Sequence, residues 1–126
     1  MPSTELLVFR QANGRVPMEE WLDALPSKAR AKCLYYMRLL TAFGHELRRP
    51  VSDSLREGIH ELRPSHLGVP YRVLYFFNGP DIVVLSHGIT KGQKVPDEEI
   101  RRAIQRKQLV LEDPARYTAK LTSKEV

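Results

Sequence analysis

The sequence contains a single cysteine among its 126 residues, so it cannot form an internal disulfide. No apolar run is long enough to cross a bilayer, and the N-terminus lacks a basic segment followed by a long apolar one. Internal repeats and low-complexity segments are also missing. These absences exclude a disulfide-stapled scaffold and a membrane-spanning protein. They favour the reducing cytoplasm, where we expect Cys33 to be a buried, inert thiol.

The chain has the size and composition of one compact domain. It is 42% hydrophobic, which suits a single core and leaves little room for a second. We predict that residues 1–113 form this domain. Residues 114–126 are more polar, and the sequence does not separate a C-terminal tail from a short packing segment. Lys and Arg number 20 against 15 Asp and Glu, giving a net charge of +5 that favours polyanionic partners such as nucleic acid.

Proline and glycine divide the chain into short elements. The patterns predict a strand over Glu5–Arg10, a short helix in VPMEEWLDALP, a longer helix with Ser27 as its N-cap and Gly44 as its stop, strands in IHELRP and on both sides of NGPD, and a last helix opened by Pro96. The order β-α-α-β-β-β-α predicts an α+β fold, a small antiparallel sheet with the helices packed on one face.

Two apolar stripes at helical spacing predict how the longer helices pack. The stripe of the first comprises Cys33, Tyr36, Met37, Leu40 and Phe43, and that of the last comprises Ile100, Ala103, Ile104 and Leu111.

The stretch YRVLYFFNGPDIVVLSHGITKGQKVP, residues 71–96, predicts a hairpin whose far end is cationic. If Gly79 and Pro80 are the two loop residues, Phe76 lies opposite Val83, Leu74 opposite Leu85, and Arg72 opposite His87. Period two then carries the same face through Ile89 to Lys91, so Arg72, His87 and Lys91 gather on it. A slip of one residue would move Arg72 and His87 to opposite faces. In the preceding strand Glu61 and Arg63 share one face, and His60 takes the other.

These residues resemble the RelE/HigB superfamily of bacterial toxins, in its phage-related-protein branch of HigB-like members. The resemblance covers about Glu5 to Leu111. It is carried by three motifs together: Glu61-Leu62-Arg63, Tyr71-Arg72-Val73, and the run from His87 to Lys91 followed by Lys94 and Pro96.

The resemblance implies a small ribosome-associated ribonuclease that cuts mRNA during translation. It also implies a cognate antitoxin encoded beside it, typically a helix-turn-helix protein. Arg72 matches the arginine that contacts the scissile phosphate, and Lys91 matches the basic residue after the last strand. Glu61 stands where RelE itself has a lysine, and the catalytic tyrosine of RelE has no counterpart, so histidines are the substitutes for the general acid and base.

The resulting candidates fall into two sets. The candidate catalytic residues are Arg72, Lys91, His87 and Arg63, and the candidate RNA-binding residues are Lys94, Arg101, Arg102, His60 and His66. The four histidines are scattered without metal-ligand spacing, so we predict neither a metal nor a cofactor.

Each candidate also has a simpler interpretation. Arg72 can serve a structural ion pair, with Glu61 as its partner, and the lysines can merely solubilise a loop. The basic run of the last helix, which includes Arg101, Arg102 and Arg106, can be a solvated face or can contact ribosomal RNA. A second hypothesis keeps the fold without the chemistry: a ParE-like toxin that binds DNA gyrase, or a basic domain that binds RNA without cutting it.

Overall fold

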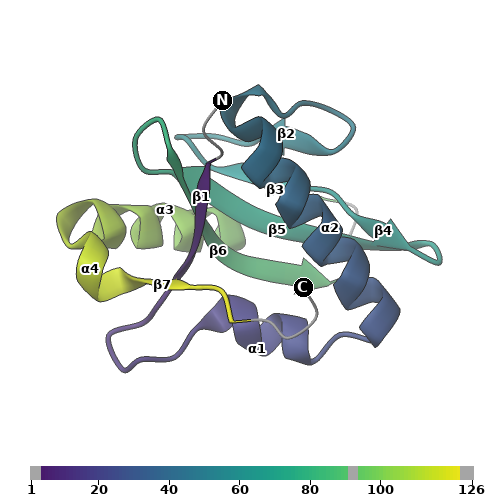
Figure 1. The fold of residues 1–126 in the computed structure, drawn as a ribbon, viewed down its shortest axis with the longest axis horizontal. Helices are drawn as coiled ribbons and strands as arrows, with labels where there is room; N and C mark the ends of the chain where they lie inside the picture. Colours follow the sequence, from purple (N-terminus) through teal and green to yellow (C-terminus); the bar gives the residue numbers. More distant parts are fainter. Residues whose placement is uncertain (1–3, 91–93, 123–126) are drawn as a thin grey trace.

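A computed structural model describes residues 4–90 and 94–122 of the chain. In these ranges the chain forms four α-helices, one short 3₁₀ helix and a sheet of seven strands (Figure 1). The α+β class predicted from the sequence is confirmed. In chain order the elements are β1 (Glu5–Phe9), α1 (Pro17–Asp23), α2 (Ser27–Phe43), the 3₁₀ helix η1 (Gly44–Glu46), β2 (Ser52–Ser54), β3 (His60–Leu62), β4 (Ser65–His66), β5 (Val69–Phe77), β6 (Ile82–Thr90), α3 (Asp97–Glu112), α4 (Pro114–Tyr117) and β7 (Thr118–Lys120).

The sheet is mostly antiparallel, as predicted. Its strand order is β2-β3-β5-β6-β1-β7, and β4 pairs with β5 outside this row. The one parallel pair among the described strands joins β1 to β6. The chain leaves β1 through the two helices α1 and α2, and a parallel neighbour requires a long connection of this kind.

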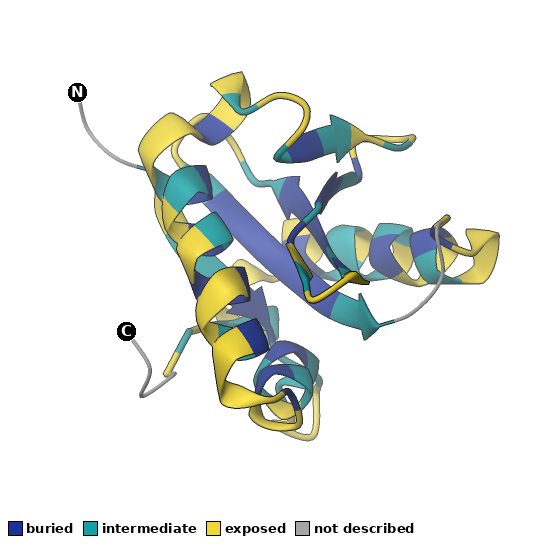
Figure 2. Ribbon diagram, turned by 90° about the vertical axis from the view of Figure 1, so that its right-hand side faces the viewer, coloured by how far each residue is buried: buried dark blue, intermediate teal, exposed yellow. Residues whose placement is uncertain are grey.

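Helices cover both faces of the sheet, which corrects the expectation that all of them lie on one. Successive residues of β5 alternate between two cores: Val73 and Tyr75 pack toward α1 and α2, while Leu74 and Phe76 pack toward α3. Figure 2 shows the buried strands between α2 and α3. The physical reason is visible in the sequence, because a strand buried on both faces is a continuous apolar run, as VLYFF is in β5.

The two apolar stripes are confirmed except at their C-terminal ends. Cys33, Met37 and Leu40 are buried, whereas Phe43 is 55% exposed. In α3 the buried residue near the end is Val110, and Leu111 is 53% exposed. Val110 follows Ala103 by two helical turns, so it returns to the same face, while the next residue points about 100° away.

Local signals set the ends of α2. Its N-cap is Pro26, and the predicted cap Ser27 is the first helical residue. Gly44 ends the helix with a φ of 53°, a conformation that favours glycine, so the predicted stop is confirmed.

The single cysteine lies in the middle of α2 and is buried. Burial raises the pKa of the Cys33 thiol to about 12, which makes it unreactive.

The segment after α3 packs back along the sheet. β7 pairs antiparallel with β1, and Tyr117 stacks on Phe9 with 6.2 Å between ring centroids. The side chain of Arg10 donates hydrogen bonds to the carbonyls of Ala115 and Arg116. The edge of β1 that faces away from β6 is therefore covered by β7 over residues Leu7 to Phe9.

Candidate functional site

The hairpin of β5 and β6 carries the predicted site, but its register differs from the prediction. Asn78 donates its backbone N–H to the carbonyl of Ile82, so the loop has three residues and not two. Gly79 adopts a φ of 82° there. Phe77 therefore lies opposite Val83, one residue away from the predicted pairing. A Gly-Pro loop cannot form the type I′ turn of many two-residue hairpins, because the second residue of that turn needs a positive φ and the proline ring excludes it.

A β-bulge returns Arg72 and His87 to the same face of the hairpin, as predicted. Between Leu74 and Tyr75 the register shifts again, so that Leu74 lies opposite His87 and Arg72 opposite Ile89. The two shifts together amount to two residues, which brings every side chain back to its original face. Arg72 and His87 thus share the face that α3 covers, as diagonal neighbours and not as a direct pair.

Arg72 is held by an ion pair with Glu61 of the neighbouring strand. The distance from Nε to Oε1 is 3.2 Å, and the two side chains are only 12% and 11% exposed. Nη1 also donates to the carbonyl of Tyr71 at 2.8 Å. Burial raises the pKa of Glu61, while the charges of Arg72 and Arg63 lower it. The guanidinium is thus fixed in orientation, and Nη2 has no partner within the described part of the chain.

His87 lies at the centre of a buried hydrogen-bond network with α3. Nε2 lies 3.1 Å from Oε1 of Glu99, and Nδ1 lies 3.1 Å from Nη1 of Arg106 and 2.7 Å from Oγ of Ser86. Because the guanidinium can only donate, Nδ1 is the acceptor and Nε2 carries the proton that Glu99 accepts. Burial first, then the charge of Arg106, lowers the pKa of His87 to about 4. The imidazole is therefore neutral near pH 7 and fixed in one tautomer.

The sequence patterns missed the two partners of His87. Glu99 and Arg106 lie seven residues apart on α3, so they face the same strand two turns from each other. That spacing is present in the sequence, but the two interpretations of the basic run around it, a solvated face or a contact with ribosomal RNA, both place it at the surface. Arg106 in fact packs inward, with its guanidinium 4.9 Å from the ring centroid of Phe9.

The other predicted residues are spread over the molecule. Arg63 follows β3 and is half-buried, His66 lies in β4, and Lys94 is exposed beside a cavity that Arg56 and Asp97 also line. His60 faces away from Arg72, on the side of the sheet that α2 covers, where its ring stacks on Tyr75. Lys91 lies outside the described residues.

Arg101 and Arg102 are paired with acidic residues of their own helix. Arg101 lies 3.2 Å from Asp97, and Arg102 lies 2.6 Å from Glu99 and 3.6 Å from Glu98. These are exposed pairs at helical spacing, which contribute little to stability.

Among the described residues, no group of three His, Cys, Asp or Glu side chains could hold a metal ion. No helix in the same ranges has the length and apolar character needed to cross a membrane.

A comparison with protein families assigns most of the chain to one of them. The family model described as phage-derived protein Gp49-like (DUF891) matches residues 20–108. The matched range runs from α1 to α3 and includes Glu61, Arg72 and His87. No curated protein matches the chain.

Proposed function

The chain belongs to the Gp49-like family of phage-derived proteins, a family of toxin-like proteins, and we propose that it is the toxin of a bacterial type II toxin–antitoxin pair. In this proposal it is a member of the RelE/HigB superfamily and acts in the cytoplasm as a ribosome-dependent mRNA endonuclease. Its partners are the ribosome with its mRNA and a cognate antitoxin, a DNA-binding protein of the helix-turn-helix type.

One observation carries the proposal: the arginine of the Tyr-Arg-Val motif is preorganised. Arg72 lies on β5 opposite Ile89, one pair before the Tyr71–Thr90 pair that ends β6. Lys91 follows Thr90 directly in the sequence. Glu61 and the carbonyl of Tyr71 fix the planar fork, and a fixed fork binds the two oxygens of a phosphate with little further loss of entropy.

The proposed reaction needs no metal. The 2′-oxygen of one nucleotide attacks the adjacent phosphorus while its proton passes to a base, the bond from phosphorus to the 5′-oxygen breaks, and that oxygen takes up a proton. The products are a 2′,3′-cyclic phosphate and a 5′-hydroxyl. Arg72, with Lys91 and Arg63, stabilises the extra negative charge of the phosphorane.

His87 is too buried to donate a proton directly to the RNA. It is 7% exposed, and both ring nitrogens have protein partners, so it is not free to meet RNA in this conformation. We propose that it joins β6 to α3 and becomes available to RNA only if Glu99 is drawn away. Lys94, Arg101, Arg102 and His66 are proposed to contact the RNA around the cut, whereas His60 lies on the other face of the sheet and is not part of that contact.

The same ion pair also favours a second candidate. If Glu61 keeps Arg72 neutralised when the target binds, the fork does not reach phosphate, and the toxin acts without cleavage. A ParE-like inhibitor of DNA gyrase is the form of that alternative.

Two parallel assays separate the candidates. The purified protein is added to a translating bacterial extract, where protein synthesis is followed, and to a DNA supercoiling reaction with gyrase. The proposal predicts loss of synthesis together with mRNA cleavage and unchanged supercoiling. Loss of supercoiling with intact mRNA would replace the nuclease by the gyrase inhibitor.

A further inference from the structure

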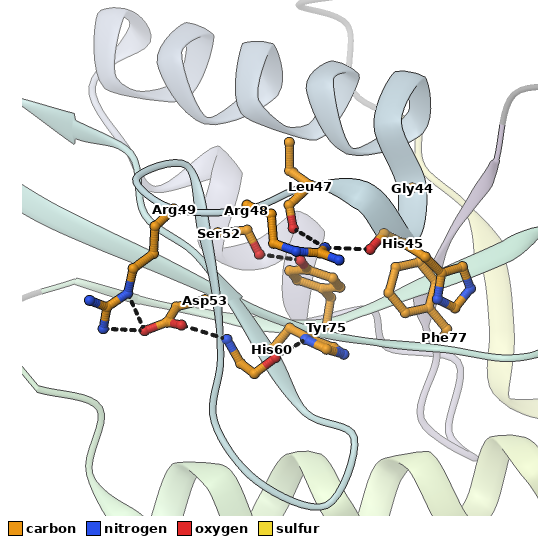
Figure 3. A pocket seen from close by; sticks show the side chains of 11 residues that line it. Gly44, His45, Leu47, Arg48, Arg49, Ser52, Asp53, His60, Tyr75 and Phe77 are labelled. Atoms are coloured by element: carbon orange, nitrogen blue, oxygen red, sulfur yellow. Dashed lines mark hydrogen bonds and ion pairs between the residues drawn. The ribbon is translucent and has the colours of Figure 1, made fainter.

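A polar cavity lies on the face of the sheet opposite Arg72 and Glu61. It has a volume of about 580 Å³, and its walls come from η1 and the loop after it and from β2, β3 and β5 (Figure 3). Pockets for small molecules usually measure about 300–1,000 Å³. We call this cavity the β2-edge pocket and define it by the side chains of His45, Arg48, Ser54, His60, Tyr75 and Phe77.

Four rings line the β2-edge pocket. His45 stacks on Phe77 with 3.6 Å between ring centroids and 19° between planes, and His60 stacks on Tyr75 at 5.2 Å and 23°. Figure 3 shows the His45 ring lying over Phe77 at one end of the cavity. His45 is exposed although it covers a partly buried ring. Flat π faces of this kind bind unstacked nucleobases without regard to sequence.

A positioned arginine lies beside the rings. Nη1 of Arg48 donates to the carbonyls of His45 at 2.7 Å and Leu47 at 3.1 Å, which fixes the guanidinium at the mouth of the cavity. Within the described ranges, Nε and Nη2 of Arg48 have no partner, and no carboxylate pairs with it. The neighbouring Arg49 differs, since Asp53 binds it at 2.7 Å. Arg48 is therefore the cation of this pocket that is available to an anion.

Uncharged donors and acceptors complete the lining. Ser54 Oγ lies 3.1 Å from Nδ1 of His60. Burial, and then the neighbouring His45, lowers the pKa of His60, which is therefore neutral near pH 7. The hydroxyls of Ser52 and Tyr75 share a short hydrogen bond. Both groups are therefore already paired, and they line the bottom of the pocket without being left to bind a ligand. The free edge of the His60 ring and the exposed Ser54 are left to meet a base or a ribose hydroxyl.

We propose that the β2-edge pocket binds one unstacked nucleotide of single-stranded RNA, with the base against the rings of His45, His60 and Phe77 and a phosphate at Arg48. The choice of RNA as the polyanion rests on the proposed function. The site itself is additional to that function, because it lies on the other face of the sheet from Arg72. It gives the protein a contact with RNA that needs neither cleavage nor the ribosome.

Direct binding of a labelled oligonucleotide tests the proposal. Fluorescein-labelled hexauridine is titrated with the full chain, without ribosomes, and anisotropy is followed at several salt concentrations. We expect His45→Ala and Arg48→Ala to weaken binding by about tenfold each, since a stacked base and a phosphate contact are worth this much. Arg48→Ala should also reduce the slope of log K against log salt by about one.

Three controls make the result specific. Arg38→Ala removes an exposed arginine of α2 that lies outside the pocket, and it should change the affinity less than threefold. His45→Phe keeps a ring over Phe77 and should retain the affinity, which separates loss of the flat ring from loss of the imidazole. A duplex RNA of the same charge has no unstacked base and should bind more weakly than hexauridine.

Equal losses in Arg48→Ala and Arg38→Ala, or equal binding of duplex and hexauridine, would overturn the proposal and reduce the pocket to a basic surface. Failure of the pocket proposal can be distinguished from failure of the proposed function. Binding that depends on His45 without ribosomal cleavage would contradict only the nuclease, whereas ribosomal cleavage by a protein whose RNA binding ignores His45 and Arg48 would contradict only the pocket.

Discussion

Nε of Arg72 lies 3.2 Å from Oε1 of Glu61 across two neighbouring strands, and both side chains are nearly buried. The arginine of the Tyr-Arg-Val motif thus has a buried acidic neighbour. The carboxylate fixes the fork and also competes with phosphate for it. Because burial raises the pKa of Glu61, this carboxyl is easier to protonate than an ordinary one, which weakens its hold on Arg72.

The ion pair predicts a stability effect that cancels in a double variant. Arg72→Met leaves Glu61 buried without its partner and should lower the free energy of unfolding by roughly 2–3 kcal/mol, somewhat less than a fully buried pair because Glu61 can take up a proton. Glu61→Gln/Arg72→Met removes both charges and should be within about 1 kcal/mol of the wild type. Urea denaturation measures the free energy of unfolding of the wild type, of Arg72→Met and of the double variant. Equal destabilisation of the single and double variants would contradict the prediction that the loss in Arg72→Met comes from Glu61 left without its partner.

His87 predicts a pH dependence of stability. Its pKa is about 4 in the folded protein against 6.5 ordinarily, so between these values the unfolded chain binds more protons than the folded one. The free energy of unfolding should therefore fall as pH falls from 6.5 toward 4, by a total on the order of 3 kcal/mol.

The variant His87→Gln isolates this effect from the carboxylates that titrate in the same range. Glutamine can still donate to Glu99 but does not titrate, so its stability curve should lie flatter than that of the wild type between pH 6.5 and 4. Curves that run parallel through this window would rule out a depressed pKa at His87.

The close approach of Trp21 on α1 to Gly88 on β6 leaves no room for a side chain at position 88. A Cβ added at Gly88 would overlap the indole of Trp21, which is itself fixed by a hydrogen bond from Nε1 to Oγ1 of Thr90 at 3.0 Å. Gly88→Ala should destabilise the protein by about 1–3 kcal/mol, as overpacking does. Because Trp21 is the single tryptophan, its emission reports the displacement directly. Adding Trp21→Leu should recover part of the loss by making room, and no recovery would place the cause elsewhere.

Removal of residues 114–126 tests the predicted domain of residues 1–113. We expect the shortened chain to fold, because both cores consist mainly of residues before 114. It should melt at least about 4 °C lower, since β1 loses its pairing with β7 and Phe9 loses Tyr117, a loss of about 1 kcal/mol or more. Thermal unfolding by circular dichroism measures this, and an unchanged melting temperature would show that the segment after α3 adds no stability.

The sequence predicted the elements better than their arrangement. Periodicity located both long helices, because each buries one stripe, and Gly44 marked the end of α2. The placement of α3 on the second face was not predicted, although the unbroken run Val73–Phe77 already indicated a strand buried on both sides. The parallel neighbour of β1 depends on contacts distant in the sequence, which local patterns do not encode.

The candidate site was predicted in part. Arg72 and His87 do share a face, but through a three-residue loop and a bulge that the turn residues did not specify. The burial of His87 under Glu99 and Arg106 depends on how α3 docks, which no local signal reports. His45 and Arg48 were not candidates at all, because the β2-edge pocket forms only when the loop after α2 closes over β5.

The most direct test of the central claim is primer extension on a defined mRNA translated by purified ribosomes. The comparison is between the wild type and Glu61→Gln/Arg72→Met, which we expect to keep the fold, with Glu61→Gln alone as the control that retains the arginine. We predict discrete ribosome-dependent cuts from the wild type and from Glu61→Gln, and a loss of more than about tenfold in the double variant, equivalent to about 1.4 kcal/mol of transition-state stabilisation. Cuts of equal rate from the folded double variant would contradict the role of Arg72, and an intact mRNA with a wild-type protein that arrests growth would contradict the nuclease itself.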